Sequence, residues 1–283
     1  MKRLYLLSFV LIFSFFPSFA QQKADKSILW EISGKDLNEP SYLLGTFHMV
    51  CLADLKLDEK VLETIQKVQQ VALEVNLTDP EEIASIQKLM FSDVTISSQL
   101  TVTELEEFRF LLQEEYNINL KSIDNLASFG LLGLLATKMV PCEVKGYDME
   151  VLEKALSLNK TILGLEHFID QIEIMTTLYP PKEILAQLKM EEDFEKNYQA
   201  MAKAFADEDI TELYALATDA TLMSKEAKKL LLDDRNEQWV IKMEKIMPTK
   251  TTLFAVGAGH LGGELGVIQL LKAKGYEVKA VLK

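Results

Sequence analysis

Segments with a strand pattern lie near both ends of this 283-residue chain, and a long helical stretch separates them. The stretch from about 103 to 247 has mostly helical periodicity. Short apolar runs typical of strands occupy residues 27–33, 41–46, 71–75, 161–165, 251–256 and 276–282. This order predicts an α/β fold with a mixed central sheet and a large helical middle segment.

The last part of the chain has the strongest pattern. A strand at 251–256, a helix at 262–274 and a strand at 276–282 form a β-loop-α-β unit, and Gly275 ends the helix. No low-complexity segment and no linker rich in proline, glycine or serine divides the chain. We therefore predict one domain over residues 21–283.

The ends of two predicted strands carry the same short motif. Gly45-Thr-Phe-His48 closes one strand and Gly257-Ala-Gly-His260 closes another, and the chain has only three histidines. Loops at strand ends are where open α/β sheets place their chemistry, and glycine leaves room there for a ligand. The pair predicts a functional site. The alternative is that each histidine only caps a strand end through a hydrogen bond.

Three acidic residues are candidates to join the histidines, because imidazole sites for metals often include carboxylates. Glu74 interrupts an apolar run, where a charge is costly unless it is paired or at the strand's end. The other interpretation is an edge residue facing water. Asp148 and Glu166 precede predicted helices, so helix capping or a favourable N-terminal charge explains them equally well. We interpret His167 as a surface or capping residue.

Arg235-Asn236 lies in a helical stretch, with Trp239 one turn further on. An arginine there can bind a substrate carbonyl or carboxylate, or orient a buried acid. A surface ion pair is the alternative. Methionines are scattered through the helices, and we predict that they fill the core rather than bind a metal: Met175, Met190, Met201, Met223, Met243 and Met247.

Residues 257–262 also match the dinucleotide-binding pattern G-x-G-x-x-G between a strand and a helix. Glu277 lies about 20 residues further on, where that motif places an acid that binds the ribose. However, Glu277 opens its strand, whereas the ribose-binding acid belongs at a strand's end. We therefore do not predict a nicotinamide cofactor.

The first twenty residues have the three parts of a secretory signal peptide. A basic start at 1–3 precedes the apolar run Leu4–Phe16, and Ser18-Phe-Ala20 provides a small-residue cleavage site. The run is shorter than the roughly 20 residues needed to span a bilayer, and Pro17 breaks it. We expect cleavage after Ala20, export to the periplasm or the extracellular space, and no stable membrane insertion afterwards.

Charge and cysteine content agree with this. The net charge is −13, which disfavours nucleic acid and anionic lipid surfaces as partners. Cys51 and Cys142 are the only cysteines, and an oxidising compartment permits a disulfide between them. Spacing alone does not decide whether they pair, because the Cα atoms must also come within reach.

The segments 43–48 and 256–276, which contain the two Gly-x-x-His motifs, resemble those of the TraB/GumN family. That family is similar to the Tiki proteins, which are metal-dependent proteases. Weaker likeness lies at 73–74, 146–148, 164–166 and 235–236. The resemblance implies two related β-α halves that each contribute one Gly-x-x-His to a central cleft, and a divalent metal, which can be manganese, cobalt or zinc.

The resemblance also implies roles for individual residues. His48 and His260 would be metal ligands, Glu74 a ligand or a general base, and Asp148 a further ligand or supporting group. The expected catalytic or supporting residues are Arg235, Asn236, Gly45, Gly257 and Glu166. The predicted function is an exported metal-dependent hydrolase acting on peptides or proteins. The alternative is a non-catalytic protein that binds a metal, haem or a peptide in the same cleft.

Overall fold

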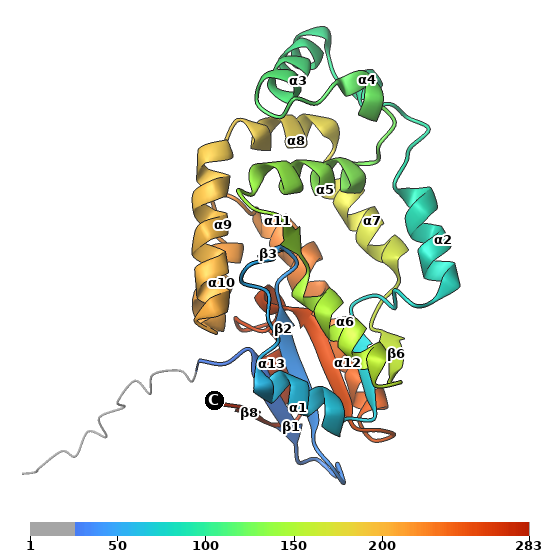
Figure 1. The fold of residues 1–283 in the computed structure, drawn as a ribbon, viewed down its shortest axis with the longest axis vertical. Helices are drawn as coiled ribbons and strands as arrows, with labels where there is room; N and C mark the ends of the chain where they lie inside the picture. Colours follow the sequence, from blue (N-terminus) through green and yellow to red (C-terminus); the bar gives the residue numbers. More distant parts are fainter. Residues whose placement is uncertain (1–25, 283) are drawn as a thin grey trace, which may run out of the picture.

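The computed structural model describes residues 26–282 (Figure 1). The predicted signal peptide at 1–20 therefore lies outside the described residues. A sheet with flanking helices forms one part of the molecule, and most of the helices between residues 80 and 206 form a second part above it (Figure 1). In residues 26–282, no helix has the length and hydropathy needed to cross a bilayer.

The central sheet is mixed and has six strands in the order β6-β4-β7-β2-β1-β8. The strands β2, β4, β6 and β7 run parallel, whereas β1 is antiparallel to both of its neighbours. This confirms the predicted α/β class. The strands are β1 Leu29–Ser33, β2 Ser41–Thr46, β4 Gln70–Leu73, β6 Thr161–Gly164, β7 Thr252–Gly257 and β8 Glu277–Ala280.

A second, two-stranded ladder joins β3 (Val50–Cys51) to β5 (Val144–Lys145). Cys51 and Cys142 form a disulfide beside it, with their Cα atoms 5.7 Å apart. The disulfide that the sequence left open is therefore present. It connects the segment that follows β2 to the segment that precedes α6.

The helices have these bounds: α1 Glu59–Lys67, α2 Pro80–Leu89, α3 Val102–Glu114, α4 Leu120–Ile123, α5 Ser128–Met139, α6 Tyr147–Ser157, α7 Phe168–Leu178, α8 Pro181–Leu188, α9 Glu191–Ala206, α10 Ile210–Ala217, α11 Lys225–Lys228, α12 Asp234–Ile246 and α13 Val267–Ala273. Single turns of 3-10 helix, η1 (Ser97–Gln99) and η3 (Ala258–His260), and a π-helical turn, η2 (Lys229–Asp233), complete the fold.

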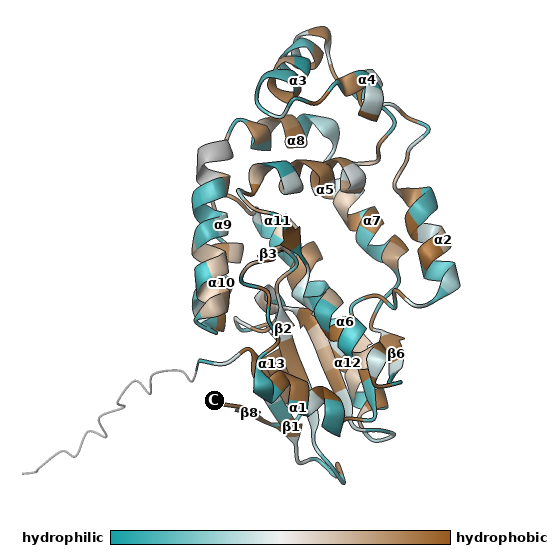
Figure 2. Cartoon of the chain, viewed as in Figure 1, coloured by the Kyte–Doolittle hydropathy of each residue, from teal (hydrophilic) through white to brown (hydrophobic). Residues whose placement is uncertain are grey.

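The two larger apolar cores correspond to the two parts of the molecule. The larger core lies around the sheet, and Leu43, Phe254 and Trp239 are fully buried in it. The smaller core holds α3, α5 and α8 together through residues such as Phe108 and Leu131. In Figure 2 the sheet strands are mostly hydrophobic, whereas several outer helices alternate between hydrophilic and hydrophobic residues. Burial of apolar surface is the main stabilising contribution in both cores.

The structure bears on two local predictions, the extent of β4 and the places of the methionines. The strand β4 ends at Leu73, so Glu74 follows the strand instead of interrupting it, and its charge lies at the sheet edge. Met243 and Met247 are core residues as predicted. Met201 is partly buried and packs against the larger core, and it also lines a pocket between helices, as do Met175, Met190 and Met223.

Candidate functional site

Four of the predicted site residues follow four parallel strands of the sheet. His48 comes after β2, Glu74 after β4, Glu166 after β6 and His260 after β7. Because β6, β4, β7 and β2 are successive neighbours and run in the same direction, their carboxyl ends share one edge. This is the edge where open α/β sheets bind ligands. Residues separated by more than 200 positions in sequence therefore meet.

The glycines of the two motifs bring the loops together. In the β2–β7 ladder Thr46 is opposite Gly257. A Cβ atom on Gly45 would lie 3.0 Å from Cβ of Ala258, so a larger residue would press against the η3 turn. A Cβ atom on Gly257 would lie 3.4 Å from Oε1 of Glu74, 3.5 Å from Cδ2 of His260 and 3.7 Å from Nε2 of His48. Gly257 therefore marks the point where the three side chains converge.

His260 is held in one orientation by the amide of Asn236. Its Nδ1 is 2.7 Å from Oδ1 of Asn236, whose Nδ2 donates to the carbonyl of Leu265 at 2.9 Å. Nδ1 of His260 therefore carries the proton, and Nε2 is an acceptor that faces Nη1 of Arg235 at 3.3 Å. Burial lowers the pKa of His260 to about 3, and the positive charge of Arg235 adds to this shift. The ring is 5% exposed and lies against Trp239. His260 is thus a neutral imidazole at pH 7.

The environment of His48 favours the protonated ring, in contrast to that of His260. Its Nδ1 is 3.2 Å from Oδ1 of Asp148, and its Nε2 is 4.0 Å from Oε1 of Glu74. The surrounding protein disfavours the charged ring, but the hydrogen bond and charge of Asp148, with the charge of Glu74, raise the pKa of His48. The side chain is 60% exposed, so solvent screens part of this attraction. Asp148, in the first turn of α6, thus pairs with His48.

Glu74 is an ionised carboxylate with donors on both oxygens. Oε1 accepts the backbone N–H of Gly257 at 2.8 Å, and Oε2 accepts Nη2 of Arg235 at 2.7 Å. Gln171 donates to Oε2 from 3.2 Å. Burial alone raises the pKa of Glu74, but the charge of Arg235, the nearby histidines and the hydrogen bond from Gly257 outweigh it, so the pKa falls to about 2.

Arg235 connects the site through four contacts. Besides Glu74, its Nη2 binds Oε1 of Glu166 at 2.6 Å, and its Nη1 donates to the carbonyl of Leu231 at 2.8 Å. Nη1 also lies 3.3 Å from Nε2 of His260. The side chain is 12% exposed, so this is a buried ion-pair network and not a surface pair. The helix α12 positions both Arg235 and Asn236 for these roles.

Two residues that the sequence did not single out as site residues complete the network. Gln171 of α7 donates to Glu166 at 2.7 Å as well as to Glu74. Trp239 donates its indole N–H to Oε2 of Glu166 at 3.0 Å. A lone glutamine in an amphipathic helix has no sequence signal. Trp239 lies one turn after Arg235, and that spacing was the only available signal for it.

The third histidine lies outside the site. His167 is the N-cap residue of α7, and its side chain is 74% exposed. Its ring binds Glu82 of α2, and its backbone N–H donates to Asp170 at 3.2 Å. The interpretation of His167 as a surface and capping residue is confirmed.

The part of the site around His48 and Glu74 opens into a pocket of about 340 Å³. His48, Glu74, Asp148 and Gln171 contribute its polar groups, and Phe129 and Phe168 are among its apolar ones. Thr46 also lines it, and its buried Oγ1 has no hydrogen-bond partner. A buried polar atom without a partner is unfavourable unless a ligand or water completes it. This pocket therefore has the composition of a ligand site.

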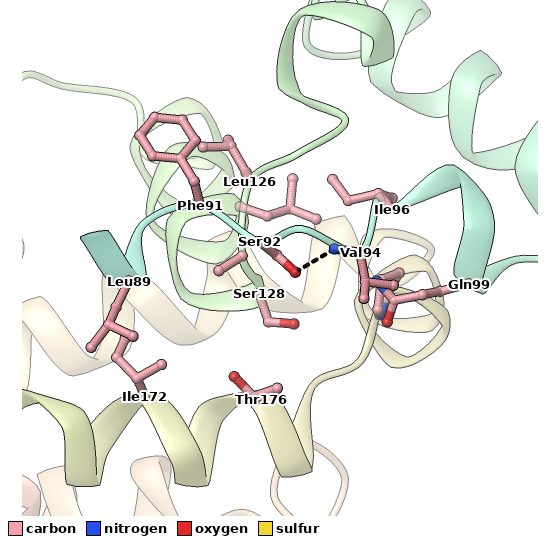
Figure 3. A pocket seen from close by; sticks show the side chains of 13 residues that line it. Leu89, Phe91, Ser92, Val94, Ile96, Gln99, Leu126, Ser128, Ile172 and Thr176 are labelled. Atoms are coloured by element: carbon pink, nitrogen blue, oxygen red, sulfur yellow. Dashed lines mark hydrogen bonds between the residues drawn. The ribbon is translucent and has the colours of Figure 1, made fainter. Parts of the chain in front are cut away.

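A different pocket, of about 350 Å³, lies between α5, α7 and residues 89–99 (Figure 3). Leu89, Leu126 and Ile172 are among the apolar side chains that surround it, and Ser128 and Thr176 contribute hydroxyl groups. No acidic, basic or imidazole side chain lines it. It lacks the groups needed for acid–base or metal chemistry.

The donor chemistry of the site fits a divalent cation. Both Nδ1 atoms have oxygen partners, as is usual around metal-bound histidine, so Nε2 is the atom of each ring that would bind a metal. Glu74 supplies an ionised oxygen beside them. Nevertheless, in residues 26–282 no three histidine, cysteine or acidic side chains are close enough to hold a metal as they stand. A cation at His260 requires Arg235 to release Nε2 of that ring.

The comparison with known families agrees with the motif pattern. The model of the TraB/PrgY/gumN family matches residues 28–280. The chain belongs to this family. No curated protein and no solved structure matches the chain. The family match covers both Gly-x-x-His segments and every residue of the ion-pair network.

Proposed function

We propose that this TraB/PrgY/gumN family member is a metal-dependent hydrolase that cleaves peptide bonds. The observation that carries the proposal is the convergence of His48, Glu74 and His260 at Gly257, with the guanidinium of Arg235 against Glu74 and His260. The three would hold one divalent cation: manganese, cobalt or zinc. Such a cation polarises a carbonyl and eases the ionisation of a water.

The protonation states of His260 and His48 support the proposed metal site. His260 is neutral, so it needs no proton loss to bind a cation through Nε2 once Arg235 releases that atom. His48 must lose a proton first, because a ring that binds a metal through Nε2 and donates through Nδ1 is neutral. Asp148 keeps the Nδ1 hydrogen bond in either state.

Glu74 acts mainly as a ligand in this proposal. Its pKa of about 2 makes it a weak proton acceptor at neutral pH, and three donors already hold its two oxygens. Of the two roles that the family resemblance implies, the geometry therefore favours the ligand over the general base.

Arg235 and Asn236 have different roles. The guanidinium of Arg235 lies beside both His260 and Glu74, so it can stabilise an oxyanion that develops next to them. Asn236 is 2% exposed and its amide faces His260 and Leu265, so it acts through His260 as a positioning residue. Glu166 and Trp239 hold Arg235 in place.

Export is part of the proposal. The pattern at 1–20 is that of a signal peptide, and a disulfide such as Cys51–Cys142 is typical of oxidising compartments. The substrate is then a peptide or protein of the periplasm or the extracellular space. The net charge of −13 argues against nucleic acid as a partner.

The test is titration of the purified mature protein with Mn²⁺, Co²⁺ and Zn²⁺ by calorimetry, followed by incubation with a peptide library. We expect one metal site per chain and cleavage that a chelator abolishes. His48→Ala and His260→Ala should each abolish metal uptake while the circular dichroism spectrum stays native.

The third histidine offers a matched control. His167→Ala removes an imidazole outside the site and should leave metal uptake unchanged. Unchanged uptake in the double variant His48→Ala/His260→Ala would exclude the proposed site. Metal uptake without cleavage of any peptide would instead favour a binding protein.

A further inference from the structure

A large apolar pocket lies next to the candidate site, between α5, α7, α8, α9 and the segment 217–231. Its volume is about 600 Å³. Five methionines line it, together with leucine, isoleucine and aromatic side chains: Met139, Met175, Met190, Met201 and Met223. Glu183 is the only charged side chain among the residues that line it. Close-packed cores leave few voids of this size, and an apolar pocket with a few polar groups has the composition of a ligand site.

The walls of this methionine pocket continue into the candidate site. On α5, Phe129 lines the site pocket and Leu132 lines the methionine pocket. On α7, Gln171 lines the first and Met175 the second. Each of these steps is about one helical turn, or about 5.4 Å. The two pockets therefore share two helices as common walls.

Two contacts also connect residues that line the methionine pocket with residues of the candidate site. Leu231, which lines the pocket, accepts the hydrogen bond of Arg235 Nη1 through its carbonyl. Ala217 also lines the pocket. Its Cβ atom lies 3.6 Å from the position that a Cβ atom on Gly259 would occupy, and Gly259 directly precedes His260. Leu231 is part of the π-helical turn η2, a distortion that is frequent at functional sites.

We propose that the methionine pocket binds the apolar side chains of a peptide substrate about two residues from the bond that is cleaved. An extended peptide advances about 3.4 Å per residue, so two residues reach slightly further than the one-turn step between the residues of α5 and α7 that line the two pockets. Methionine side chains are unbranched and flexible, so the pocket accepts several bulky apolar residues rather than one shape. This inference rests on the proposed hydrolase function and names the substrates that it selects.

The test compares two fluorescently labelled heptapeptides, one with three central leucines and one with three central serines. Binding is measured by fluorescence anisotropy with the metal-free mature protein in chelator, so neither metal nor turnover is needed. We expect the leucine peptide to bind at least tenfold more tightly than the serine peptide. Equal affinities would overturn the inference.

Variants of the pocket wall locate the binding. Met175→Glu places a charge in the pocket and Leu132→Trp fills it, and each should weaken binding of the leucine peptide at least tenfold. Thr177→Glu and Lys138→Trp make the same changes at exposed positions of α7 and α5, and should have no effect. A leucine-peptide affinity that neither pocket variant alters would overturn the inference. Thermal melts check that every variant is folded.

Measurement of peptide cleavage kinetics with metal present separates this inference from the proposed function. With metal, Met175→Glu should raise KM for the leucine peptide about tenfold and leave kcat unchanged. Selective binding without cleavage under any metal would remove the hydrolase proposal and leave an apolar peptide site. Cleavage of both peptides with equal kcat/KM would keep the hydrolase and remove the inference. Binding of oleate in preference to the leucine peptide would assign the pocket to an acyl chain, and so would also overturn it.

Discussion

Nδ1 of His260 donates a hydrogen bond to Oδ1 of Asn236 across 2.7 Å, and Asn236 is itself fixed by the carbonyl of Leu265. The two residues lie on different elements, η3 and α12, 24 positions apart in sequence. This contact sets which nitrogen of His260 faces the site. Outer hydrogen bonds of this kind orient a metal-binding ring and fix its tautomer.

Asn236→Ala should therefore weaken metal binding by about 10- to 100-fold without removing any proposed ligand. Asn236→Asp keeps an acceptor for Nδ1 and should retain more of the affinity than Asn236→Ala. Calorimetric titration with Co²⁺ measures both. Asn125→Ala, at an exposed asparagine, is the control. Equal affinities of the alanine and aspartate variants would show that the hydrogen bond to His260 is not what orients the ring.

Arg235→Gln should destabilise the metal-free protein by about 3–5 kcal/mol, because Glu74 and Glu166 would remain as buried carboxylates without their cation. Arg235→Lys keeps the charge but not the planar group, so its loss should be smaller. Urea unfolding in chelator measures the change. Arg109→Gln, at an exposed position of α3, should stay within about 0.5 kcal/mol of wild type. A similar small change for Arg235→Gln would contradict the buried network.

Acid should destabilise the metal-free protein through His260. The unfolded ring binds a proton near pH 6.5, whereas the folded ring does so only near its pKa of about 3. Between these values the unfolded state holds more protons, so stability falls as the pH falls, by about 1.4 kcal/mol per pH unit. The low pKa of Glu74 adds a further loss below about pH 4.5.

Urea unfolding at pH 6.5 and pH 4.5 tests this. His260→Gln should lose about 2 kcal/mol less than wild type across this interval. His48 and His167 have raised pKa values, so their stabilising contributions are fully present below pH 6.5. His167→Gln should therefore follow wild type. A nuclear magnetic resonance titration gives the pKa of the His260 ring directly, and a value near 6.5 would refute the prediction.

Loss of the disulfide should affect both stability and the site. Cys51 and Cys142 close a loop of 91 positions, so Cys51→Ser/Cys142→Ser should cost about 4–5 kcal/mol in urea unfolding. The bond also clamps β3 to the segment before β5, between His48 and its partner Asp148. Metal affinity should fall in the double variant and in the reduced wild-type protein alike. Unchanged affinity in both would show that the β3–β5 ladder alone positions the two residues.

Local patterns in the sequence predicted much of the fold. The hairpin of β1 and β2, the short strand β6 and the final β7-α13-β8 unit follow from apolar periodicity and turn residues, which act over short distances. Gly275 has a φ of +92° and lies just past α13, as its place after an amphipathic run predicted. The predicted strand at 71–75 extends past the observed end of β4 at Leu73, because apolar periodicity does not distinguish a strand's last residue from the first residue of the loop.

The sequence determined which side chains carry the chemistry: two histidines after strand-ending glycines, with acids at other strand ends. Only the tertiary structure decided how they are used. Strand order placed β7 between β2 and β4, which brought His48, His260 and Glu74 to one edge. Burial then made one ring neutral, while Asp148 favours the charged form of the other. Protonation depends on desolvation and on neighbours distant in sequence, and a one-dimensional pattern contains neither.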